Sequence, residues 1–252
     1  MQSNNPAFNE NLLSHFDHAG IRSTTMTVSG TAIKTFVLLG LLMASAAWSY
    51  EEADRGDLGM GLLIGSAIGG SLLALITIFK PTVAGWTSPV YSVLEGIFLG
   101  AISQQVDARY PAGSGIAIQA VALTGATTFA MLFLYGTRII QVTNQLVTMV
   151  TAATGAIALV YLVTMLARIF GFDIPYIHGS GPIGIGFSVV VVGLAAFNLL
   201  LDFDFIERGS AAGLPKSMEW YGAFGLMVTL VWLYLEILRL LRKLNGNERR
   251  DD

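Results

Sequence analysis

Five acidic residues lie inside or at the ends of long apolar segments, and they are the side chains of this sequence best able to do chemistry. These residues are Glu95, Asp202, Asp204, Glu219 and Glu236. A charge within a bilayer costs at least about 2.5 kcal/mol, so an acid kept at that depth is a candidate functional residue. Carboxylate oxygens bind protons and hard cations such as Ca²⁺. The five acids therefore indicate chemistry with protons or cations.

Asp202, Asp204 and Glu219 flank one connection between two apolar segments. Residues two apart on a helix diverge by roughly 200°, so only one of Asp202 and Asp204 is expected to face the protein. A short connection makes the two helices antiparallel neighbours and puts Glu219 at about the depth of Asp202. Touching carboxyl groups share a proton and respond to pH. We therefore predict a pH-sensitive pair of Asp202 and Glu219 that can bind Ca²⁺. The alternative is that Asp202 and Asp204 are interfacial residues in contact with headgroup water.

Glu95 and Glu236 are more separate candidates. Glu95 lies near the middle of an apolar segment and is the deepest charge that we expect; it is either functional or a protonated, hydrogen-bonded packing residue. Glu236 follows Glu219 by 17 residues, which is roughly 25 Å along a helix, so the two should lie at opposite interfaces. We expect the partner of Glu236 to be Arg239 or Arg242, with the side chain of Glu236 reaching toward the interface.

Long apolar segments must position these acids. The chain is 54% hydrophobic and 12% charged, whereas soluble domains carry about 25% charged residues. Blocks of roughly twenty apolar residues can each cross a hydrocarbon core about 30 Å thick. We predict an all-α polytopic bundle of about seven transmembrane helices, which cover residues 31–50, 58–79, 85–106, 115–136, 147–170, 182–202 and 216–240. Residues 1–30 form a polar N-terminal segment, residues 31–241 the transmembrane domain and residues 242–252 a charged tail.

Several function classes have no support in the sequence. The net charge is −3 and no basic stripe exists, which argues against a nucleic-acid partner. There is no cysteine, and no metalloprotease, serine-nucleophile or phosphate-loop motif lies on the apolar segments, so we expect no enzyme. The expected partner is the lipid bilayer, and no cofactor is expected beyond Ca²⁺ as a permeant or bound ion.

The charges in the connections bear on orientation. The connections on the N-terminal side hold more basic residues than those opposite, which favours a cytoplasmic N-terminus. These residues are Arg22, Lys34, Lys80, Arg138, Arg208 and Lys216, against Arg55, Arg109 and Arg168. The basic C-terminal tail also prefers the cytoplasm, and both preferences are met only if one segment is re-entrant.

Within 58–79, the spacing of Gly61, Gly65 and Gly69 predicts close helix packing.

Three stretches carry a resemblance to a known family. They are Glu95-Gly96-Ile97-Phe98-Leu99-Gly100, Leu201-Asp202-Phe203-Asp204-Phe205-Ile206 and Leu233-Tyr234-Leu235-Glu236-Ile237-Leu238. With them the chain resembles the Bax inhibitor / YccA-like (TMBIM) family of seven-helix membrane proteins. The opening Ser3-Asn4-Asn5-Pro6-Ala7-Phe8 and Met218-Glu219-Trp220-Tyr221 resemble a bacterial branch of that family.

The resemblance implies two three-helix layers around a central C-terminal helix, and a Ca²⁺ leak governed by an acidic pair between the sixth and seventh spans. Asp202 matches the first acid of that pair. The residue pattern of the motif matches Glu236 to the second acid, with glutamate in place of the usual aspartate. The expected depth in the membrane favours Glu219 instead.

Two functions follow as expectations. The first is a pH-sensitive cation leak, with Ca²⁺ as the expected ion, in a bacterial inner membrane. The alternative is a regulatory protein that binds and inhibits a membrane-bound ATP-dependent protease through an exposed N-terminus.

Overall fold

The computed structural model describes residues 24–110, 115–171, 179 and 181–248, and regular structure in these residues is helical. Seven long helices are present: α2 (Val28–Arg55), α3 (Met60–Phe79), α4 (Ala84–Asp107), α5 (Ile116–Gly136), α6 (Asn144–Ile169), α8 (Pro182–Ala211) and α9 (Met218–Glu248). A short 3₁₀ helix, η1 (Pro81–Val83), joins α3 to α4. The predicted all-α fold is confirmed.

Six of these helices, all except α4, are long and apolar enough to cross a membrane. α4 matches the predicted segment 85–106 in position, but its composition is less apolar. The buried residues of α4 include Ser88, Ser92 and Ser103, and the helix packs against α2, α3 and α9. Polar side chains are tolerated on α4 because they face neighbouring helices rather than lipid.

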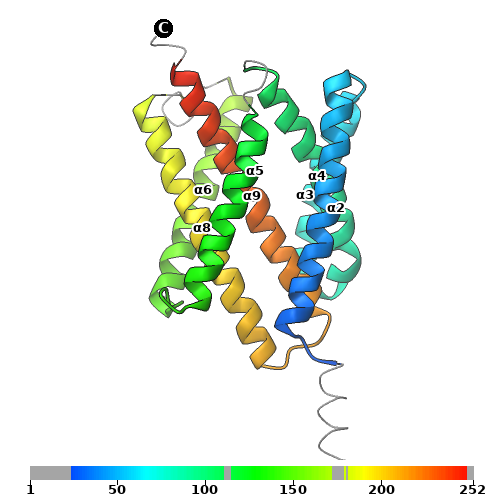
Figure 1. The fold of residues 1–252 in the computed structure, drawn as a ribbon, viewed down its shortest axis with the longest axis vertical. Coiled ribbons are helices and arrows are strands. Elements are labelled where there is room, and N and C mark those ends of the chain that lie inside the picture. The colour runs from blue at the N-terminus through cyan, green and yellow to red at the C-terminus, as the bar shows by residue number, and fades with distance from the viewer. Residues whose placement is uncertain (1–23, 111–114, 172–178, 180, 249–252) are drawn as a thin grey trace, which may run out of the picture.

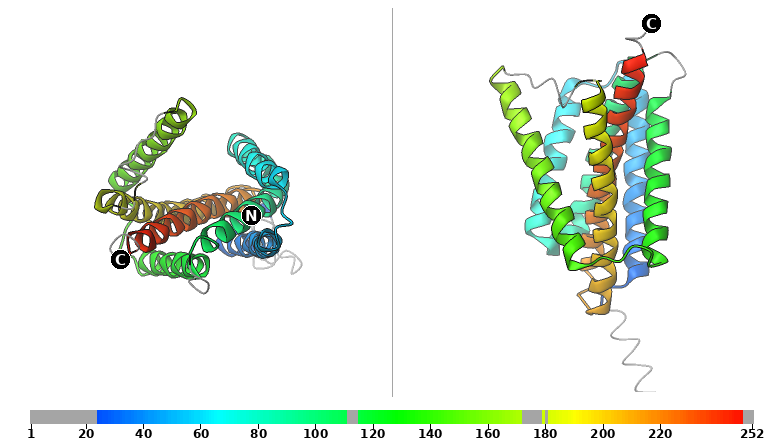
Figure 2. Two further views of the ribbon diagram at one scale, coloured as in Figure 1. Left: turned by 90° about the horizontal axis from the view of Figure 1, so that it is seen from above. Right: turned by 90° about the vertical axis from the view of Figure 1, so that its left-hand side faces the viewer.

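α9 is the centre of the bundle. It contacts α2, α4, α5 and α8, and among the six membrane-crossing candidates it has the largest share of buried residues. Seen from above, α2, α3 and α4 lie on one side of α9, and α5, α6 and α8 lie on the other (Figure 2). This arrangement confirms the predicted two layers of three helices around a central C-terminal helix.

The connection between α8 and α9 is bridged by the residues that precede α2. Thr25 pairs with Pro215 in an isolated antiparallel bridge, and the Met26 amide donates to the Leu214 carbonyl at 2.6 Å. The Met26 side chain is buried and lies against Gly209 of α8 and Gly222 of α9, where an added Cβ would be 3.1 Å and 3.3 Å from it. The start of α2 therefore holds the α8–α9 hairpin in place.

Glycines of α4 allow this helix to pack closely against α2, whereas only part of the glycine series on α3 lies at a helix contact. A side chain on Gly96 or Gly100 would collide with the Leu42 or Ala46 backbone of α2. The prediction for α3 holds at Gly69, where an added Cβ would lie 3.1 Å from the Leu94 side chain. It is wrong at Gly61 and Gly65, because α3 turns that part of its surface away from its neighbours and an added Cβ would meet nothing within 4 Å.

α2 begins at one end of the bundle and α9 ends at the other (Figure 1). Each of the seven long helices runs between these two ends, and none is re-entrant. A cytoplasmic side shared by the start of α2 and the end of α9, which the basic residues favour, is therefore not compatible with the described helices.

Candidate cation site

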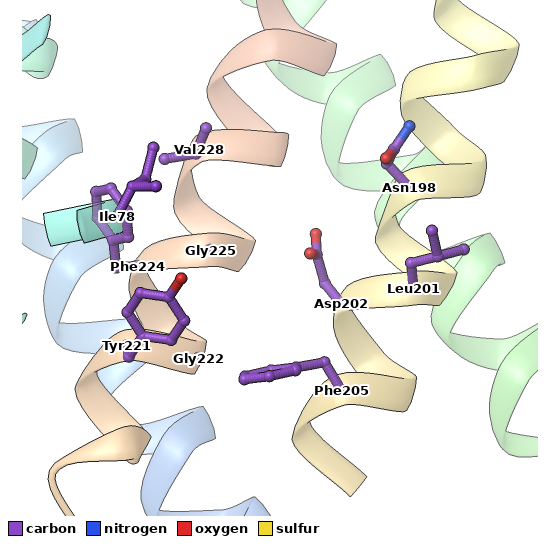
Figure 3. A pocket seen from close by; sticks show the side chains of 10 residues that line it. All are labelled: Ile78, Asn198, Leu201, Asp202, Phe205, Tyr221, Gly222, Phe224, Gly225 and Val228. Atoms are coloured by element: carbon purple, nitrogen blue, oxygen red, sulfur yellow. The ribbon is translucent and has the colours of Figure 1, made fainter. Parts of the chain in front are cut away.

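Asp202 lies in a cavity between α8 and α9. The cavity has a volume of about 360 Å³, and the Asp202 carboxyl points across it from α8 toward α9 near Gly225 (Figure 3). An added Cβ on Gly225 would meet nothing within 4 Å, so this glycine leaves the space open. We call this space the Asp202 cavity; it is lined by Ile78, Asn198, Leu201, Asp202, Phe205, Tyr221, Gly222, Phe224, Gly225 and Val228.

The protein does not compensate the charge of Asp202. Its Oδ2 atom is buried and has no hydrogen-bond partner among the described residues. The Thr229 hydroxyl of α9 lies beside the carboxyl group and donates to the Gly225 carbonyl at 3.3 Å. Among the described residues that line the Asp202 cavity, none is basic. An unpaired carboxylate enclosed in a medium of low dielectric constant is costly, so a proton or a bound cation must neutralise it.

Asp204 faces a different direction, as the helical spacing predicts. Its carboxylate forms an ion pair with Arg208 at 2.7 Å, and Arg208 also donates to the Val142 carbonyl at 3.2 Å. Arg208 is exposed while Asp204 is half-buried. Of the two aspartates, Asp202 faces the Asp202 cavity and Asp204 lies at the surface of the bundle.

Glu219 does not meet Asp202. Its side chain is 1% exposed and pairs with Lys34 of α2, and it accepts hydrogen bonds from the Thr27 amide at 3.0 Å and the Thr27 hydroxyl at 2.9 Å. The expected match in depth is wrong because α8 does not end at residue 202. It continues to Ala211, about 14 Å further along its axis, so Asp202 is level with Gly225 and Thr229.

Glu236 has charged and hydrogen-bonding partners in the second half of α9. It pairs with Arg239 at 2.7 Å and accepts hydrogen bonds from the Tyr161 hydroxyl at 2.9 Å and the Trp232 indole at 3.3 Å. The expected partner Arg239 is confirmed, although Glu236 is 1% exposed rather than interfacial. Since neither Glu219 nor Glu236 lines the Asp202 cavity, no acid of α9 there forms the pair that the family resemblance implies.

Glu95 lies on α4 against α3. A Cβ added to Gly70 would lie 3.0 Å from its Oε2 atom. Glu95 is outside the Asp202 cavity, but Tyr91, one turn earlier on α4, packs edge-on against the cavity-lining Phe224 with ring centroids 5.2 Å apart. A functional and a packing role for Glu95 both fit this position.

Three residues that contact the candidate acids or line the Asp202 cavity were not predicted from the sequence. Asn198 precedes Asp202 by four residues and therefore shares its helix face, a signal that could have been used. A lysine inside an apolar segment needs a partner, so Lys34 pointed to an acid elsewhere. Thr229 gives no local signal, because its importance depends on where α9 lies against α8.

A multidentate metal centre is not assembled in the part of the chain that is described, where no three His, Cys, Asp or Glu residues group together. The fold and the site define an integral membrane protein of helical-bundle type with one uncompensated acid enclosed between its last two helices. A family model described as Bax inhibitor 1 like matches residues 5–246, so the chain belongs to the Bax inhibitor 1-like family. No curated protein and no solved structure gives a significant match.

Proposed function

We propose that the protein is a cation leak, with Ca²⁺ as the main ion, and that protonation of Asp202 controls it. The observation that carries the proposal is the enclosed Oδ2 atom of Asp202, which has no hydrogen-bond partner in a cavity between two helices. Membership of the Bax inhibitor 1-like family supports a membrane role of this kind. The control differs from a shared acidic pair, because a single carboxyl group carries the charge.

The sign of the pH dependence follows from that carboxyl group. At acidic pH the group is neutral and does not attract a cation. At alkaline pH the carboxylate is negative and can replace part of the hydration shell of a cation. Since its neutralising partner is then the ion rather than a fixed basic side chain, cation entry rises with pH.

The Asp202 cavity suits a passing ion better than a tightly held one. Ca²⁺ takes six to eight oxygen ligands. Polar oxygens in the lining come from Asp202, Asn198 and the Tyr221 hydroxyl, and both amide hydrogens of Asn198 are used by Thr154 and Leu194. Water must supply the other ligands, which favours weak binding and release.

The test is Ca²⁺ uptake into liposomes that contain the purified protein, measured at acidic, neutral and alkaline pH. Uptake by the unaltered protein should increase with pH. Asp202→Asn should remove the pH dependence and lower uptake at alkaline pH about tenfold, equivalent to about 1.4 kcal/mol. Asp204→Asn is the matched control and should retain the pH dependence, because Asp204 is paired with Arg208. Equal pH dependence in the two variants would refute the proposal.

The orientation that accompanies this proposal puts the N-terminal end of α2 in the cytoplasm of a bacterial inner membrane. The connections at that end hold Lys80, Arg138, Arg208 and Lys216, which supports the assignment by the positive-inside rule.

Inhibition of a membrane-bound ATP-dependent protease is the second candidate. The segment through which it would act, residues 1–20, lies outside the described residues. Deletion of residues 1–20 distinguishes the candidates, because it should change the turnover of membrane proteins only if the protease is a partner, whereas the leak depends on Asp202.

A further inference from the structure

The walls of the Asp202 cavity are mainly aromatic and aliphatic, which is unusual for a site that serves only a hydrated metal ion. Phe205 of α8 and Tyr221 of α9 pack edge-on with ring centroids 6.1 Å apart. Phe224 lies beside Tyr221, with centroids 6.5 Å apart. The three rings and one carboxylate border the same space (Figure 3).

The charge and the rings favour the same kind of ligand. An organic ammonium ion is attracted both by a carboxylate and by the faces of aromatic rings, and its hydrocarbon groups gain from leaving water. Of the cavity-lining residues in the described part of the chain, Asp202 alone is charged. Tyr221 is the other titratable residue in the lining, and the remaining neighbours on α8, α9 and α3 are uncharged. A ligand with one positive charge and an apolar body therefore matches the whole surface.

The exposed surface beside the Asp202 cavity further restricts the class of ligand. Ile78 and Phe205, which line the cavity, are 48% and 40% exposed on the outside of the bundle. In a membrane this outer surface faces hydrocarbon, because Asp202 lies about 14 Å along α8 from its end at Ala211. A ligand that enters through this outer surface must dissolve in the bilayer, so this route favours an ammonium ion with an apolar body.

We propose that the Asp202 cavity binds a lipophilic organic ammonium ion, with the nitrogen at the Asp202 carboxylate and the hydrocarbon groups against Phe205, Tyr221 and Phe224. The ligand neutralises the carboxylate that the protein leaves unpaired. The proposal uses the same carboxylate as the cation leak and adds a ligand class to it. It shares with the proposed function the requirement that Asp202 loses its proton. It does not require that the protein conducts ions, because binding is measured without ion flux.

The experiment measures binding of tetrapropylammonium by isothermal titration calorimetry, with the full chain in nanodiscs of neutral phosphatidylcholine and empty nanodiscs as the blank. The unaltered protein should show saturable binding at alkaline pH. Asp202→Asn should weaken binding at least about tenfold, and Phe224→Leu should weaken it several-fold through loss of one ring. Asp204→Asn should bind as the unaltered protein does, because Asp204 lies outside the cavity.

A second variant fills the space without removing the charge. An added Cβ on Gly225 has open space around it, so Gly225→Leu should exclude tetrapropylammonium while the protein still elutes as a folded species. No saturable binding by the unaltered protein, or equal binding by Asp202→Asn, would overturn the ammonium site.

The two proposals can fail separately. Saturable, Asp202-dependent binding without any Ca²⁺ uptake supports the ammonium site and refutes the leak. Asp202-dependent Ca²⁺ uptake without binding of tetrapropylammonium supports the leak and overturns the ammonium site.

Discussion

Replacing Gly100 by alanine is expected to lower the free energy of unfolding by about 3 kcal/mol or more, at the upper end for an overpacked core. The added methyl group would meet the Ala46 carbonyl of α2. A backbone group cannot turn aside as a side chain can, so α2 and α4 must move apart. These two helices form an extensive contact in the bundle, and their separation removes packing along much of their length.

Reversible unfolding in mixed micelles measures the free energy of unfolding of each variant. The melting temperature of each variant in detergent is measured as well. Gly65→Ala is the matched control, since an added Cβ there meets nothing within 4 Å. Alanine also favours a helix over glycine by about 0.5–1 kcal/mol, so this control should be neutral or stabilising. Equal melting temperatures for Gly100→Ala and Gly65→Ala would mean that the α2–α4 contact is looser than described.

Glu219→Gln is expected to cost about 3–5 kcal/mol, the range for removing one partner of a buried ion pair. Lys34 would keep its charge in a position that is 18% exposed and lose its carboxylate partner. Because Glu219 also accepts two hydrogen bonds from Thr27, the variant should loosen the start of α2 from the start of α9. Unfolding in mixed micelles measures the loss.

A double-mutant cycle separates the charge from the packing. Lys34→Met combined with Glu219→Gln should lose less stability than Glu219→Gln alone, since no uncompensated charge remains. Glu51→Gln is the control for an exposed pair, because Glu51 and Arg55 are both exposed and such pairs contribute about 0–1 kcal/mol. Additive losses in the cycle would show that Lys34 and Glu219 do not interact.

Much of the fold could be predicted because the bilayer fixes helix length. Apolar segments of about twenty residues must become helices that satisfy their own backbone hydrogen bonds. The ends of these helices are harder to predict. Residues 203–211 mix charged and apolar types, which resembles a connection, yet α8 continues through them. Because the predicted helix ended at residue 202, Asp202 was expected at the depth of Glu219, whereas the longer α8 places it deeper.

Only those features of the candidate site that depend on residue spacing along one helix could be predicted from the sequence. The divergence of Asp202 from Asp204 and the pairing of Glu236 with Arg239 follow from positions on a single helix. The contact between Lys34 and Glu219 joins residues 185 positions apart. No local pattern encodes such a contact, and the same is true of the neighbourhood of Asp202 and Thr229.

The glycines show the same limit. Spacing identifies small residues that share a helix face, but not which face meets another helix. Gly61 and Gly65 lie on an outward surface of α3, whereas Gly96 and Gly100 lie against α2.

The most direct test of the central claim is the release of protons when Ca²⁺ is added to the purified protein. At a pH at which Asp202 is partly protonated, Ca²⁺ that binds the carboxylate displaces the remaining proton, so up to about one proton per chain should appear in a weakly buffered solution as Ca²⁺ approaches saturation. Asp202→Asn should release none, and Asp204→Asn should release as much as the unaltered protein. Equal release by Asp202→Asn and the unaltered protein would contradict the assignment of Asp202 as the group that exchanges a proton for a cation.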